Sequence, residues 1–162
     1  MAARHSYREL DQLDRRILSI LQTEGRISNI ELARRINLSA TPCLERVRRL
    51  ERDGFITGYA ALVAPEKLDA GLIAFIEVSL DRTTADVFER FKAAVTATAE
   101  VQECHMVAGG FDYLLKVRVA DMAAYRRFLG DRLAELPGVS QTHTYVVMEE
   151  VKATQAVPVP GV

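Results

Sequence analysis

The sequence predicts an α+β protein with a small helical N-terminal domain and a larger C-terminal domain that mixes strands and helices. Two observations carry this prediction. Residues 28–54 hold two short amphipathic helical patterns with a tight turn between them. Residues 72–152 hold four apolar strand patterns and two helical patterns in the order strand, helix, strand, strand, helix, strand.

The helix pair in residues 28–54 is marked by its capping and turn residues. Ser28, with Glu31 three residues later, forms a capping-box pattern at the start of the first helix. Asn37 tolerates the left-handed backbone of a tight helix exit, and Ser39 can cap the second helix. Pro42 is compatible with a first helical turn, where N–H groups have no intrahelical partner. The spacing predicts two short helices joined by a very short turn.

The second helix of the pair has an apolar face and a basic face. Leu44, Val47 and Leu50 recur at three-residue spacing and are expected to face the core. The arginines between them then lie outside, and the small residues 41–43 lie at the exposed N-terminal tip. This pattern is typical of a helix-turn-helix that enters the DNA major groove; the alternative is an ordinary helical hairpin with a solvated basic face. The residues expected to contact DNA are Ser28, Asn29, Ser39, Thr41, Pro42, Cys43, Arg46, Arg48 and Arg49.

Flanking segments complete the expected N-terminal domain. Residues 11–24 carry a helical apolar pattern that Gly25 ends, which predicts a supporting first helix. Residues 55–63 suggest a short hairpin around Thr57-Gly58, a wing beside the helices. The predicted architecture is a winged helix-turn-helix DNA-binding domain over 10–60, followed by a linker over 61–71.

The C-terminal domain, 72–152, reads as a ferredoxin-like βαββαβ sandwich. The expected strands are 72–80, 101–107, 111–119 and 139–151, and the expected helices are 84–97 and 121–136. Helices cover one side of such a sheet, yet these strands carry apolar residues on both faces. The uncovered side therefore predicts a dimer, with a monomer that has an apolar open sheet as the alternative. The ends of the chain, 1–9 and 153–162, are predicted to be disordered.

Composition narrows the class of protein. The 162 residues are 49% hydrophobic, which is enough for a core without disulfides or metals. Residues 1–60 contain 11 arginines and 8 acidic residues, a balance of +3, whereas the remainder carries −4. The two cysteines, Cys43 and Cys104, form no metal-ligand pattern, and no stretch has the length of a signal peptide core or membrane span. These features predict a reduced, cytoplasmic protein with no membrane contact and no metal.

Three long segments, LSATPCLERVRRLERDGFITGYAALV, GGFDYLLKVRV and LPGVSQTHTYVVMEEVK, resemble the Lrp/AsnC family in the right order. The similarity runs from about Leu10 to Lys152. The resemblance implies a bacterial, nucleoid-associated transcription factor that binds double-stranded DNA and responds to an amino acid. It also implies a homodimer that assembles further, often into an octamer, with the effector bound between dimers.

The resemblance also implies an effector site around the turn 108–113. Its residues would be Met106, Gly109, Gly110, Asp112, Tyr113, Met122, Tyr145, Val146 and Val147. A glycine turn can offer backbone N–H groups to a carboxylate, and Asp112 can meet the ammonium or instead serve a structural hydrogen bond. Ala108 and Gly110 differ from the residues of the closest members, so the expected effector is leucine or another small amino acid, with no other cofactor.

Other functions are less consistent with the residues. Cys104 and His105 are adjacent on a strand, so they point to opposite faces and cannot form a nucleophile–base pair; an enzyme is not expected. The remaining alternatives are an amino-acid-binding regulatory subunit of a metabolic enzyme and a ligand-independent DNA-organising protein. The leading prediction is an amino-acid-responsive transcriptional regulator.

Overall fold

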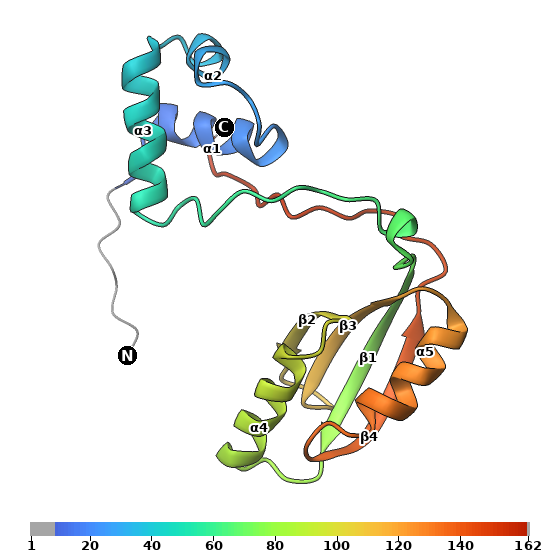
Figure 1. Ribbon diagram of the computed structural model, residues 1–162. Helices are drawn as coiled ribbons and strands as arrows, with labels where there is room; N and C mark the ends of the chain where they lie inside the picture. Colours follow the sequence, from blue (N-terminus) through green and yellow to red (C-terminus); the bar gives the residue numbers. More distant parts are fainter. Residues whose placement is uncertain (1–8, 162) are drawn as a thin grey trace. The chain divides into compact units, whose positions relative to one another are not determined.

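The computed structural model describes residues 9–161, and these residues form two compact units (Figure 1). One unit comprises the chain up to Leu62 together with the segment from Lys152 onward, and the other comprises Val63–Val151. The predicted α+β class is confirmed, and the first boundary falls close to the predicted one. The prediction for residues 1–9 lies, except for Glu9, outside the described residues.

The N-terminal unit contains the three predicted helices, α1 (Gln12–Thr23), α2 (Asn29–Arg35) and α3 (Ala40–Arg52). Asn37 between α2 and α3 has φ of 57°, the left-handed conformation that its position in the tight turn requires. The three helices enclose one small core. Its buried residues are Ile17, Leu32, Ala33, Ile36, Cys43 and Leu50.

The predicted caps form only in part. The Ser28 hydroxyl accepts a hydrogen bond from the Glu31 backbone N–H at 3.2 Å, as expected for an N-cap. The reciprocal half of the capping box is absent because the Glu31 carboxylate binds arginines of its own helix. Ser39 occupies the N-cap position of α3, but its side chain makes no capping hydrogen bond.

The predicted hairpin at residues 55–63 is wrong. Gly54, with φ of +77°, ends α3 and turns the chain back, so the backbone N–H groups of Phe55 and Ile56 donate to the Leu50 carbonyl oxygen. Residues 56–64 then run on without strand pairing within the described chain. The backbone of Phe55 and Ile56 thus closes the end of α3 rather than pairing with a neighbouring strand.

The C-terminal unit has the predicted order of elements. Its elements are η1 (Pro65–Leu68), β1 (Leu72–Leu80), α4 (Ala85–Thr96), β2 (Val101–Met106), β3 (Tyr113–Val119), α5 (Met122–Phe128), η2 (Leu129–Leu133) and β4 (Val139–Val146). The four strands form one antiparallel sheet in the order β2-β3-β1-β4. The second predicted helix changes to a π-turn at η2, and β4 ends five residues earlier than its predicted end at Val151.

Both helices of this unit, α4 and α5, cover the same face of the sheet (Figure 1). Alternate residues of β1, from Ala74 to Leu80, are buried against them together with Leu115 and Val117 of β3. Phe91 of α4 and Phe128 of α5 fill the space above the sheet. The other face, which holds Phe75 of β1, is left without a covering layer within the described chain.

The C-terminal tail, which was predicted to be disordered, makes contacts with α1 near its end. The segment from Lys152 onward belongs to the N-terminal unit, and Val157, Pro160 and Gly161 hydrogen-bond to α1. The Gln22 side chain donates to the Val157 carbonyl oxygen at 3.0 Å and accepts from the Val157 N–H at 2.7 Å. Arg15 and Gln12 donate to the carbonyl oxygens of Pro160 and Gly161, respectively. Polar side chains on the outer face of α1 thus satisfy an extended backbone that has no strand neighbour.

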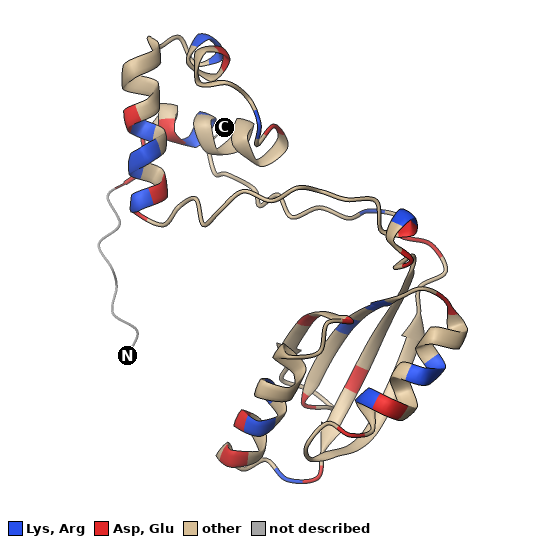
Figure 2. Cartoon of the chain, viewed as in Figure 1, with Lys and Arg blue, Asp and Glu red and all other residues tan. Residues whose placement is uncertain are grey.

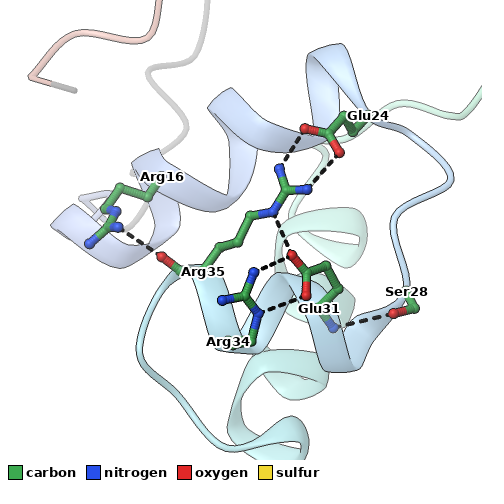
Figure 3. Close-up of polar contacts among 6 residues, drawn as sticks. All are labelled: Arg16, Glu24, Ser28, Glu31, Arg34 and Arg35. Atoms are coloured by element: carbon green, nitrogen blue, oxygen red, sulfur yellow. Dashed lines mark hydrogen bonds and ion pairs between the residues drawn. The ribbon is translucent and has the colours of Figure 1, made fainter.

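Arg35 ties α2 to the end of α1 (Figure 3). Its guanidinium donates to both carboxylate oxygens of Glu24, and its Nε donates to Glu31 at 2.9 Å. Arg34 adds two hydrogen bonds to the same Glu31 carboxylate. Hydrogen bonds from Arg34 and Arg35 lower the pKa of Glu31 to about 2.

We expect the stability contribution of Glu31 to depend on pH. Because its pKa is about 2 when folded and 4.5 ordinarily, the contribution is complete above 4.5 and disappears as the pH falls towards 2. The free energy of unfolding of wild type should therefore exceed that of Glu31→Gln at neutral pH, and the difference should shrink below 4.5. Urea unfolding followed by circular dichroism measures this.

Glu45→Gln is the control for this measurement. It removes an exposed carboxylate of α3 that forms no ion pair among the described residues, so it matches the loss of one negative charge. A Glu31→Gln difference that stays constant as the pH falls from neutral to about 2 would contradict the role given to the Arg34 and Arg35 hydrogen bonds.

Candidate nucleic-acid interface and effector site

The inner face of α3 is formed by Cys43, Val47 and Leu50, which are four and three residues apart and therefore lie along one side of the helix. Cys43 is 0% exposed, whereas Leu44 is 36% exposed. The prediction that Cys43 contacts DNA is wrong, because its position places it one turn before Val47 on the core side. Burial raises the pKa of the Cys43 thiol.

The outer face of α3 carries Thr41, Glu45, Arg48 and Arg52, which are all exposed and follow one another at helical spacing. Basic residues gather on the C-terminal half of this helix (Figure 2). They border an open hollow of about 620 Å³ whose lining residues are Pro42, Glu45, Arg46, Arg48, Arg49 and Arg52. Arg48 and Arg52 form no ion pair within the described chain, so their guanidinium groups are available to a polyanion.

Arg46 and Arg49 are held by acidic residues of α1. Arg49 Nη2 lies 2.6 Å from both carboxylate oxygens of Asp14, and Arg46 Nη1 lies 2.7 Å from Asp14 Oδ1 and 2.5 Å from Asp11 Oδ2. The two arginine side chains are only 23% and 25% exposed. They were predicted to contact DNA from the outer side of the helix, and the structure places them in an ion-paired cluster; their contact with DNA stays a prediction.

This cluster is tied to the start of α1. Asp11 caps the helix by accepting from the Asp14 N–H at 2.8 Å, and the Asp14 carboxylate accepts from the Asp11 N–H. Burial alone would raise the pKa of Asp11, but hydrogen bonds from Asp14 N–H and Arg46 keep it below its ordinary value. The sequence carries a signal for this arrangement, because two acids three residues apart at a helix start form a capping pattern.

The remaining predicted DNA contacts lie at the helix starts. Ser39, Thr41 and Pro42 are exposed at the N-terminal tip of α3. Ser28 caps α2, and the Asn29 amide donates to the Ala40 carbonyl oxygen at 2.7 Å, which joins the starts of α2 and α3. Ser28 and Asn29 thus have structural roles, and their contact with DNA stays a prediction.

The predicted effector residues fall into two groups at opposite ends of the sheet. Met106 and Tyr113 pair with each other, and Tyr113 pairs with Val78 near the end of β1. Val146 pairs with Ala74 near the start of β1. These two points of β1 are four residues apart, which corresponds to roughly 13 Å along a strand. A single chain therefore does not bring the two groups together.

At the first end, the β2–β3 loop is closed by Asp112. Its carboxylate accepts from the Leu80 N–H at 2.7 Å, and its own N–H donates to the Val78 carbonyl oxygen. Asp112 therefore makes a structural hydrogen bond, which was one of the two roles that the sequence analysis considered for it. Gly109 and Gly110 are exposed, neither has a positive φ, and a Cβ at either would meet no atom within 4 Å. Their backbone does not require glycine in this chain.

Tyr113 does not fit its predicted role. Its side chain is 2% exposed and packs against the Phe91 ring, with the ring centroids 4.5 Å apart. Because its position on β3 faces the helices, it is a core residue of the helix side, and its prediction as an effector contact is corrected. Burial raises the pKa of its hydroxyl.

The other predicted effector residues are apolar and incompletely covered. About half of the side-chain surface is exposed to solvent in Met106, Met122, Tyr145 and Val146. Large apolar side chains that gather on a surface in this way often mark a binding site. Tyr145 also donates to Glu77 across the open face of the sheet at 3.2 Å.

Among the described residues, no cluster of His, Cys, Asp or Glu could hold a metal ion. None of the described helices is both long and apolar enough to cross a membrane.

Two family models match the chain, one for each unit. Residues 10–57 match the winged helix-turn-helix DNA-binding model, and residues 73–157 match the Lrp/AsnC ligand binding domain. The first match includes α1, α2 and α3, and the second includes all four strands except the first residue of β1. Together they assign DNA binding to the unit that contains the arginine-bearing helix and ligand binding to the unit that contains the half-exposed apolar residues.

Similar proteins extend these matches over nearly the whole chain. The leucine-responsive regulatory protein of Salmonella typhimurium is 63% identical over 145 residues, 90% of this chain and 88% of that protein. The protein of the same name from Escherichia coli K12 is 62% identical over the same coverage. A transcriptional regulator from Neisseria meningitidis, solved in complex with L-Met, superposes with a TM-score of 0.90 at 41% identity, covering 94% of this chain and 98% of that one.

These findings confirm the predicted fold class and the prediction that the chain is a regulator rather than an enzyme. The chain belongs to the Lrp/AsnC family of DNA-binding transcriptional regulators, with an amino-acid-responsive ligand-binding domain.

Proposed function

We propose that this regulator binds operator DNA through the outer face of α3 and that an amino acid changes its DNA affinity or its oligomeric state. The observation that carries the DNA-binding part is the exposed row of Thr41, Arg48 and Arg52 on a helix whose opposite face is core. Arginine donates to phosphates and to guanine edges, and a single helix fits the major groove. Ser39 and Pro42 complete the tip that approaches the bases.

The effector is proposed to be an apolar amino acid such as leucine or methionine. The relatives from Salmonella and Escherichia coli are leucine-responsive regulatory proteins, and the Neisseria regulator was solved in complex with L-Met. The half-exposed apolar side chains of Met106, Met122 and Val146 suit such a ligand. Because these residues lie at two ends of one sheet, we place the ligand between subunits, where two chains can each contribute one group.

A dimer through the open sheet face, assembling further to an octamer, is proposed as the working form. Ile73, Phe75 and Leu114 lie on the face opposite the helices, beside charged neighbours such as Glu77 and Lys116. A second copy of this face would cover the apolar residues and pair the charged ones. Because such regulators act on chromosomal DNA, we place the protein in the bacterial cytoplasm, on the nucleoid.

Two alternatives make different predictions. A regulatory subunit of a metabolic enzyme would bind the amino acid without binding DNA. A ligand-independent DNA-organising protein would bind DNA without responding to any amino acid. Only the proposed function requires both responses in one molecule, so DNA affinity measured with and without effector distinguishes the three.

Arg48→Ala should weaken binding to a duplex taken from upstream of the chain's own gene. Removal of one phosphate contact should also lower the slope of log affinity against log salt by about 1. Thermal stability should not change, because Arg48 is exposed. Fluorescence anisotropy at several salt concentrations measures both quantities.

Arg126→Ala, which removes an equal charge from α5 in the ligand-binding unit, is the matched control and should leave affinity and slope unchanged. Equal affinity of the Arg48→Ala variant and wild type would count against α3 as the recognition helix.

Titration with L-leucine, L-methionine and the other proteinogenic amino acids should identify at least one that changes DNA affinity or the sedimentation coefficient. The physical reason is linkage: a ligand that binds one assembly state better shifts the population towards it. Gel shift and sedimentation velocity follow the two responses. An absence of response to every amino acid would favour the DNA-organising alternative.

A further inference from the structure

One carboxylate inside the DNA-binding unit has an unusual environment. Asp14 is 3% exposed, and it is the only polar or charged residue of residues 9–161 that is classed as buried. It accepts three hydrogen bonds of 2.6–2.7 Å from Arg46 and Arg49. A buried carboxylate is stable as a charged group only with partners of this kind, because loss of both arginines would leave a buried charge without compensation.

The guanidinium groups of Arg46 and Arg49 have more N–H donors than the Asp14 carboxylate binds. Each guanidinium carries five N–H donors. Toward the acids, Arg46 uses only Nη1 and Arg49 uses only Nη2. Their Nε and remaining Nη groups are free of described hydrogen bonds, and both side chains line the same open hollow as Arg48 and Arg52. Two arginines that line this hollow are thus held by acids of α1, and the other two form no ion pair among the described residues.

We propose that Asp14 is a positioning residue for DNA binding: it fixes Arg46 and Arg49 so that their unused N–H groups meet the DNA backbone or base edges in one geometry. Asp11 supports the same arrangement from the surface through Arg46. A preset donor loses less conformational freedom on binding than a free side chain does. This inference rests on the proposed DNA binding and adds the role of the acids of α1 to it.

The sign of the effect separates positioning from simple electrostatics. DNA is a polyanion, so removal of a negative charge near its binding surface should strengthen binding if charge alone matters. If Asp14 and Asp11 position the arginines, their neutralisation should weaken binding instead. The same substitution therefore gives opposite results under the two explanations.

The test compares Asp11→Asn, Asp14→Asn and Glu45→Gln in the full chain. Each substitution removes one negative charge from the N-terminal unit, but only the first two remove a hydrogen-bond acceptor of Arg46 or Arg49. Asn is as good an N-cap as Asp, so Asp11→Asn keeps the start of α1. The probes are the upstream duplex and a random-sequence duplex at equal salt.

We expect Glu45→Gln to bind both duplexes at least as tightly as wild type. Asp14→Asn should bind the upstream duplex about tenfold more weakly, which is the loss expected when one good arginine contact is misplaced. Asp11→Asn should also weaken binding, by less, because it contacts Arg46 alone. Thermal unfolding confirms that each variant is folded at the temperature of the measurement.

A second pair of variants covers the case in which Asp14→Asn does not fold. Arg49→Lys keeps the charge, and its one nitrogen can still reach Asp14, but it lacks the spare Nε and Nη1 donors that the proposal assigns to DNA. Arg48→Lys instead changes an arginine with no described ion pair. Positioning predicts a clear loss of upstream-duplex affinity for Arg49→Lys and a smaller one for Arg48→Lys. A purely structural salt bridge predicts a lower melting temperature for Arg49→Lys with unchanged affinity of the folded protein.

The outcomes are distinct. Tighter or equal DNA binding by Asp14→Asn and Asp11→Asn, with wild type binding DNA normally, overturns the positioning role and leaves the proposed function intact. Equal effects of Arg49→Lys and Arg48→Lys on affinity also overturn it. Wild type that binds neither duplex overturns the proposed function, and the positioning role with it.

Discussion

The arrangement of the DNA-binding unit depends on one buried carboxylate. Asp14 on α1 faces Arg46 and Arg49 on α3, and the same three residues fix the distance and rotation between these helices. Breaking a buried pair of this kind costs about 3–5 kcal/mol, which is a large share of the stability of a small unit. The apolar core of the unit is small, so a polar contact has an unusually large part in specifying its geometry.

This constraint divides the arginines of one helix between two tasks. Arg46 and Arg49 share a buried carboxylate, so their departure towards a phosphate would leave the Asp14 charge buried without a partner. Arg48 and Arg52 are exposed and can adapt to the path of a DNA backbone. Donors held in one orientation, as in Arg46 and Arg49, can discriminate between DNA sites by geometry. Exposed donors, as in Arg48 and Arg52, can add affinity through their charge. This division reconciles a modest net charge with DNA binding.

The sequence was sufficient for the order of elements but not for the contacts between them. Helical and strand periodicity located α1 to α3 and the four strands because those patterns depend on neighbouring residues alone. Cys43 was placed on the wrong side of α3 because Leu44 is more apolar, although the spacing of 43, 47 and 50 makes the better stripe. The contact of residues 157–161 with α1 involves partners more than a hundred residues apart, and an extended segment with two prolines carries no local sign of it.

The position of the half-exposed apolar residues indicates how a ligand could reach the DNA-binding unit. β1 begins at Leu72 and β4 ends at Val146, and the Val147 N–H donates to the Ile73 carbonyl oxygen, so both lie at one end of the sheet. Both covalent connections to the N-terminal unit, before β1 and after β4, therefore leave from that end. Tyr145 and Val146 lie there as well. Under the proposed function, a ligand that orders these two residues would act on β4, the strand from which the chain continues to the tail segment that hydrogen-bonds to α1 from Val157 onward.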